Sequence, residues 1–254
     1  DNTDATGFYA VIVPNGTYNV HFTPTVASRL APAVHPSVIV AANTVLNTTV
    51  ANGILLSGVI RDDLNAPLAG VDIDAKRLPS GVSVPLSGDQ TDALGSFATV
   101  VAAGTYDIEI EPLWSSKLVG KKISNRTLTN DTSLNESLLA GFIVQGTVRD
   151  GNSVPVPSVD VDAVKHATTD TVFVPLDLTD AVGHYQMLVP GGSYLLAYKT
   201  TPSSGMQDSS FAPGTFHSAV YSLRGSQTKT WKSSALAISA STRESCPAPI
   251  INSR

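Results

Sequence analysis

The stretch TDALGSFATVVAAGTYDI, residues 91–108, occurs three times in this sequence in altered form. TDATGFYAVIVPNGTYNV at 3–20 and TDAVGHYQMLVPGGSYLL at 179–196 align with it without a gap, and successive copies are 88 residues apart. The equivalent aspartates are Asp4, Asp92 and Asp180. Self-similarity at a fixed period is typical of tandem domains, so the fold can be worked out from one unit.

Each unit has the pattern of a small β-domain. ILLSGVIRD at 54–62 and FIVQGTVRD at 142–150 are apolar or alternating runs, which predict strands. The TDAxG motif predicts a turn, because Asp can bond the backbone two residues on and Gly accepts a positive φ. FATVVAAGTYDIEI, from Phe97, then predicts a hairpin. About seven short strands with frequent turns predict an all-β fold of tandem Ig-like β-sandwiches.

The period divides the chain into four regions. Residues 1–53 are a partial unit without its first two or three strands, called here the leading half-unit. Residues 54–141 and 142–238 are complete units, the second and third units, and the tail 239–254 resembles the first strand of another. In the tail SASTRESCPAPIIN aligns with SGVIRDDLNAPLAG of the second unit, with Arg243 under Arg61 and Pro249 under Pro67.

The motif series also resembles a known family. The pattern G-x-V-x-D, a Pro turn, G-V-x-V, T-D-x-x-G-x-[FY] and G-x-Y-x-[IL] is similar to carboxypeptidase-regulatory-like, transthyretin-like β-sandwich repeats and to related Cna-B-type domains. The residues that carry it in the second unit are Gly58, Val59, Asp62, Pro67, Gly70, Val71, Thr91, Asp92, Gly95, Phe97, Gly104 and Tyr106. The resemblance implies an extracellular module that spaces, stiffens or presents other domains and carries no catalytic residues.

Composition narrows the function classes. The net charge is −5 and only 15% of residues are charged, which argues against the clustered Lys and Arg of a nucleic-acid interface. Cys246 is the single cysteine, so an internal disulfide framework is excluded. No apolar run reaches the ~18–20 residues of a membrane span. A first residue Asp1 in place of Met is consistent with a processed secreted protein, and we expect an extracellular or cell-surface location.

Candidate binding chemistry is sparse, and no enzyme motif occurs. The alternating pairs Asp72–Asp74 and Asp160–Asp162 are weak calcium candidates with hard oxygen ligands, or else a solvated edge that discourages aggregation. We expect no other cofactor. Trp114 is a candidate sugar platform with Trp231 and Tyr221, or packs in a core. The glycosylation sequons lie at Asn15, Asn47, Asn125, Asn130 and Asn135.

An isopeptide cross-link, common in Cna-B-type domains, would need a Lys, an Asn or Asp and a buried acid. The predicted first strands carry Arg61 and Arg149 in place of Lys, and Lys76 is replaced by Val164 in the third unit. The sequence therefore predicts no cross-link common to the units.

The leading half-unit raises the question of what completes it. Either these residues belong to a longer parent chain that supplies the strands, or the tail of one molecule completes the next, head to tail. The residues expected to meet in the second case are Phe8, Val11, Val13, Tyr18, Ala237, Ile238, Arg243 and Pro249. The expected function is a surface stalk or filament subunit. The alternative is an adhesin or a carbohydrate-binding accessory region with a glycan ligand.

Overall fold

The structure is a computed structural model that describes residues 2–175, 177–200, 209–216 and 221–227, the last two ranges by their backbone alone. The chain divides into two compact parts, Asp1–Ala140 and Gly141–Arg254. Within the described ranges all regular structure is β, apart from the 3₁₀ turns η1 (Val26–Ser28) and η2 (Trp114–Ser116). The predicted all-β class is therefore confirmed. No helix among these residues has the length and hydropathy to cross a bilayer.

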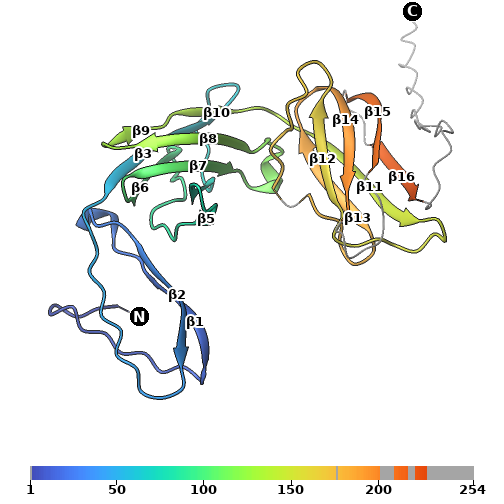
Figure 1. Ribbon diagram of the computed structural model, residues 1–254. Coiled ribbons are helices and arrows are strands. Elements are labelled where there is room, and N and C mark those ends of the chain that lie inside the picture. Colours follow the sequence, from blue (N-terminus) through green and yellow to red (C-terminus); the bar gives the residue numbers. More distant parts are fainter. Residues whose placement is uncertain (1, 176, 201–208, 217–220, 228–254) are drawn as a thin grey trace, which may run out of the picture. The chain divides into compact units, whose positions relative to one another are not determined.

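The second unit is a sandwich of two sheets (Figure 1). One sheet has β3 at its centre, antiparallel to β6 on one side and parallel to β9 and β10 on the other; their bounds are Ile54–Asp62, Ser96–Val101, Thr132–Ser133 and Glu136–Leu138. The other sheet has the order β5–β4–β7–β8; in chain order these strands are Asp72–Arg77 (β4), Val82–Ser83 (β5), Gly104–Glu111 (β7) and Lys121–Leu128 (β8).

The third unit repeats this arrangement. Its central strand β11 (Phe142–Asp150) pairs antiparallel with β13 (His184–Val189) and parallel with β16 (Tyr221–Gln227). The second sheet has the order β12–β14–β15, with bounds Asp160–Lys165, Gly192–Lys199 and Ser209–Phe216. In both units the central strand is therefore paired antiparallel on one side and parallel on the other.

Alternation along the strands forms each core. Leu56 and Ile60 on β3, and Ile73 on β4, are fully buried because every second side chain faces the opposite sheet. Two tyrosines occupy equivalent buried positions: Tyr106 bonds the Ala102 carbonyl at 2.7 Å, and Tyr194 bonds that of Pro190 at 2.8 Å. The two tyrosines are 88 residues apart, so the repeat places them at the same point of each unit.

The leading half-unit contains a single antiparallel pair, β1 (Gly16–Phe22) and β2 (Ala33–Val40) (Figure 1). The offset of 88 residues makes this pair the counterpart of β7 and β8. Residues 8–13 and 43–50 flank it in the chain and belong to no strand. The half-unit thus has part of one sheet and no strand of the other among the described residues.

The TDAxG segments are tight turns, as the sequence predicts. The Asp92 carboxylate accepts the backbone N–H groups of Leu94 and Ser96, at 2.8 and 2.9 Å, and Asp180 and Asp4 do the same in their copies. The glycines have left-handed backbones, with φ of +74° at Gly95 and at Gly183 and +83° at Gly7. The aspartates therefore brace turns that only glycine completes without strain.

Alanine substitutions at two of these glycines should have unequal effects. A Cβ on Gly95 would lie 2.4 Å from the Ile60 carbonyl oxygen, whereas one on Gly7 meets nothing within 4 Å. Gly95→Ala should therefore cost about 2 kcal/mol of folding free energy, from strain plus a clash, and Gly7→Ala about 1 kcal/mol of local strain. Urea unfolding with hydrogen exchange measures both, and equal costs would contradict the interpretation.

Candidate functional site: an open sheet and a repeated carboxylate cluster

The leading half-unit exposes a row of apolar side chains that the complete units bury. Val11, Ile12 and Val13 are 46%, 103% and 39% exposed. Their counterparts in the second unit, Thr99, Val100 and Val101, are 0%, 3% and 0% exposed, and those in the third unit, Met187, Leu188 and Val189, are 0%, 6% and 0% exposed. The difference follows from the central strand, because β3 and β11 pair with these segments and residues 8–13 pair with no strand of the described chain.

Aromatic contacts line the inner face of this half-unit. The Tyr9 and Phe22 rings meet edge to face at 5.5 Å, and the Phe22 and His35 rings meet in the same way at 5.8 Å. His35 Nε2 also bonds the Thr48 hydroxyl, and the Tyr9 hydroxyl donates to the Leu46 carbonyl at 2.6 Å. These contacts hold residues 8–13 and 43–50 on one side of the β1–β2 pair.

The assembly residues expected from the sequence are placed in part. Phe8, Val11 and Val13 are 67%, 46% and 39% exposed. Tyr18 is half-buried, and its hydroxyl donates to the Pro14 carbonyl at 2.7 Å. The partner residues Ala237, Ile238, Arg243 and Pro249 lie outside the described residues, as does Cys246. The structure thus describes the receiving side of the expected contact and leaves the donating side as a prediction.

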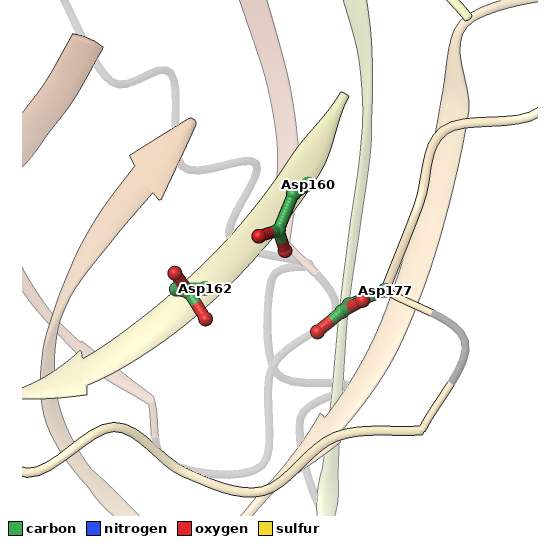
Figure 2. Close-up of side chains that lie close together, drawn as sticks. All are labelled: Asp160, Asp162 and Asp177. Carbon is green, nitrogen blue, oxygen red and sulfur yellow. The ribbon is translucent and has the colours of Figure 1, made fainter. Parts of the chain in front are cut away.

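A group of carboxylates gathers on the second sheet of the third unit. Asp160 and Asp162 lie two residues apart on β12, and Asp177 approaches from the segment before β13 (Figure 2). One oxygen of each lies within 4.8 Å of the others. The Lys199 ammonium is 2.5 Å from the Asp162 carboxylate and 3.8 Å from that of Asp160. Burial, and then the charge of Asp160, raises the pKa of Asp177 to about 6.

The second unit places carboxylates at the same three positions, Asp72, Asp74 and Asp89. Here Glu111 stands where the third unit has Lys199, so the cation is replaced by another acid. Burial is the main cause that raises the pKa of Asp72, Asp74 and Glu111, and neighbouring carboxylates raise it further. The second unit therefore has an acid where the third unit has Lys199, and Lys76 is the cation that lowers the pKa of Asp74 and Glu111.

The structure adds one carboxylate to each predicted calcium site, and in the third unit it shows a lysine that would compete with the cation. Sequence reasoning missed Asp89 and Asp177, because only the fold brings them beside the aspartate pairs. In the second unit the segment before β6 lies beside β4, where the Ile73 N–H donates to the Asp89 carbonyl. In the third unit the segment before β13 lies beside β12, where the Val161 N–H donates to the Asp177 carbonyl. Oxygen clusters suit hard cations, but Lys199 already serves as the counter-ion in the third unit. Calcium binding stays a prediction for both units.

The remaining candidate residues are scattered. The five sequon asparagines are exposed. The side chain of Asn135 already takes part in a hydrogen bond, because its oxygen accepts the Val59 N–H at 2.9 Å. The Trp114 indole is 43% exposed with the Lys117 ammonium 4.9 Å from its ring centre. Trp231 lies outside the described residues, and Tyr221 is described by its backbone only. The sugar platform therefore stays a prediction.

Lys76, considered above for a cross-link, forms an ion pair with a buried acid. The Glu109 carboxylate is buried, and the ammonium groups of Lys76 and Lys122 lie 2.7 and 3.3 Å from it. Two cations on one buried carboxylate satisfy its charge without a covalent bond.

Comparisons with known proteins found weak similarity to solved structures. No family profile matches the chain, and no curated protein matches it. A type II cohesin–X-dockerin complex from Acetivibrio cellulolyticus contains a chain 26% identical over 35% of this one, with a TM-score of 0.27; the match spans 59% of that chain.

Two pilins also match at lower identity. A streptococcal ancillary pilin is 15% identical, with 86% of this chain and 77% of that chain covered and a TM-score of 0.28. The major pilin subunit of Bacillus cereus is 8% identical, with 70% and 100% covered and a TM-score of 0.26. At TM-scores this low the comparisons support no conclusion about this chain, so the fold rests on the strands described above. The resemblance to carboxypeptidase-regulatory-like repeats stays a prediction.

Proposed function

We propose that this chain is a non-catalytic structural module of an extracellular or cell-surface protein. In this proposal the complete sandwiches serve as rigid spacers and the leading half-unit joins to the tail of the next copy, head to tail. The observation that carries it is the contrast in exposure between residues 11–13 and their buried counterparts. A row of exposed apolar side chains beside an unpaired backbone favours association with another strand.

Head-to-tail contacts have a defined consequence for assembly. The surfaces at the two ends differ, so the contact is heterologous, and a heterologous contact that does not close builds a filament. Strand addition would supply main-chain hydrogen bonds along the junction, and the apolar row would supply burial. A surface stalk or fibre needs both properties, since it must extend by repetition and resist separation.

Assembly of the chain tests this function. The full chain should form species of several times 26.4 kDa by light scattering as its concentration rises, and filaments should be visible by electron microscopy. A variant without residues 233–254 should remain monomeric with the second and third units still folded. A full chain that stays monomeric at every concentration would overturn the proposal.

The adhesin alternative makes a different prediction. A glycan ligand would use the half-exposed Trp114 indole, and a Trp114→Ala variant would lose binding on a glycan array without any effect on assembly. Our proposal predicts the reverse, because Trp114 lies in the second unit, away from the leading half-unit in sequence.

A further inference from the structure

Each complete unit begins and ends with strands that pair with each other. In the second unit the first strand, β3, is parallel to β9 and β10, which are the last two (Figure 1). In the third unit the first strand, β11, is parallel to β16, the last strand that the structure describes. The chain therefore enters and leaves each complete unit through one parallel ladder of hydrogen bonds.

A pull on the chain loads this ladder along its length. Tension enters the second unit at Ile54, where β3 begins, and leaves it at Leu138, where β10 ends. Leu138 lies opposite Asp62, the last residue of β3, so the two points of attachment are at opposite ends of the ladder. The strands are therefore drawn past each other, and the bonds between them share the load. Antiparallel terminal strands would instead be pulled from one end, and their bonds would open one after another.

Additional hydrogen bonds extend the ladder of the second unit where its regular pairing is interrupted. β9 and β10 pair with two separate stretches of β3. Between these stretches the Leu134 N–H donates to the Ser57 carbonyl at 2.7 Å, and the Asn135 side-chain oxygen accepts the Val59 N–H at 2.9 Å. Before β9 the Asp131 carboxylate accepts one more N–H of β3, at 3.0 Å. The bonds between the terminal strands therefore continue along nearly the whole of β3.

Two leucines also anchor the last segment of the second unit in its core. Leu134 and Leu138 are 6% and 1% exposed, and they belong to the same apolar cluster as Leu56 and Ile60 of β3. If β9 and β10 slide along β3, these side chains must leave the core while the hydrogen bonds break. Apolar burial therefore adds to the resistance of the ladder.

We propose that the complete units are load-bearing elements, in which the parallel ladder between the first and last strands resists tension along the chain. This role rests on the proposed function, since a stalk or fibre must stay folded when it is pulled. The third unit has the same ladder, in continuous register from the Val144–Tyr221 pair to the Asp150–Gln227 pair. Forced unfolding is governed by the rate of unfolding, so the direction in which the bonds are loaded matters as well as their number.

Pulling the second unit in two directions tests the proposal. Handles for an optical trap are attached to the full chain through two introduced cysteines, with Cys246→Ser to remove the native thiol. Asn52→Cys with Ala140→Cys pulls along the ladder, whereas Asp63→Cys with Ala140→Cys pulls from one end, because residues 63 and 140 both follow the same end of it. All three positions are exposed. We expect a several-fold higher unfolding force along the ladder than from its end.

The hydrogen bond of Asn135 provides a second measurement. Asn135→Ala removes the acceptor of the Val59 N–H, and the rate of unfolding along the ladder at constant force should rise about fivefold, which corresponds to about 1 kcal/mol. Asn130→Ala is the matched control, because Asn130 is an exposed asparagine of the same segment and its side chain bonds the neighbouring Thr129 hydroxyl. The control should unfold at the rate of the parent.

The outcomes separate the load-bearing role from the proposed assembly. Equal unfolding forces in the two directions, for two double-cysteine variants with the same melting temperature, overturn the load-bearing role even if the chain forms filaments. A higher force along the ladder in a chain that stays monomeric supports this role and overturns only the head-to-tail function. An Asn135→Ala variant that unfolds at the rate of the parent overturns the contribution of its side-chain bond to the ladder.

Discussion

Replacing Gly58 by alanine is expected to detach the β9–β10 segment from the second unit. The new Cβ would lie 1.7 Å from the Leu134 carbonyl oxygen and 2.5 Å from its carbon, and real Cβ atoms do not come within 3.0 Å of such neighbours. Both contacts are backbone, so no side-chain rotation relieves them. Leu134 N–H donates to the Ser57 carbonyl at 2.7 Å, and its buried side chain belongs to the core, so displacement loses pairing and packing together.

The expected cost is about 4 kcal/mol, at the upper end for single substitutions. Hydrogen exchange should locate the loss of protection at β3, β9 and β10, with the third unit unaffected. Gly81→Ala is the matched control in the same unit, because its φ is +68° and nothing lies within 4 Å of its Cβ position. If Gly58→Ala has the melting temperature of the parent while that of Gly81→Ala is lower, the close approach of the Leu134 backbone is not the reason for glycine at position 58.

The sequence predicts the repeat because its signal lies in local chemistry. An aspartate that brackets a turn and a glycine with positive φ are needed in every copy, so Asp92 and Gly95 recur at a fixed offset. Alternation then predicts which residues of β3 and β4 are buried. The same local rules predict that residues 3–20 end in a hairpin strand, which β1 confirms.

The features missed by sequence reasoning depend on contacts between distant segments. The role of Gly58 follows from the crossing of Leu134, 76 residues further along the chain. The carboxylate cluster needs Asp177 beside β12, and Asp177 has no motif of its own. Comparing the repeats could have found it, because Asp89 and Asp177 are also 88 residues apart.

Exchanging the charge at one ladder position should make the stability of the third unit more sensitive to pH. Asp160 pairs with Lys199 in the third unit as Asp72 pairs with Glu111 in the second. Lys199→Glu removes the cation that lowers the pKa of Asp177 and adds a fourth carboxylate. After allowance for solvent screening we expect a loss of about 3 kcal/mol at pH 7.5, against about 1 kcal/mol for the neutral control Lys199→Met.

The dependence of stability on pH distinguishes an effect of charge at position 199 from an effect of packing. The pKa of Asp177 is already raised from 3.8 to about 6, so the folded unit binds protons between these values that the unfolded chain releases. Stability therefore falls as the pH rises from about 4 to about 6, and Lys199→Glu should steepen this fall and extend it to higher pH.

The reverse exchange, Glu111→Lys, should stabilise the second unit at pH 7.5, because it lowers the raised pKa values of Asp72 and Asp74. Urea unfolding of both variants at pH 4.5 and 7.5 checks this, and an equal loss for Lys199→Glu at the two values would mean that Lys199 acts through packing and not through its charge.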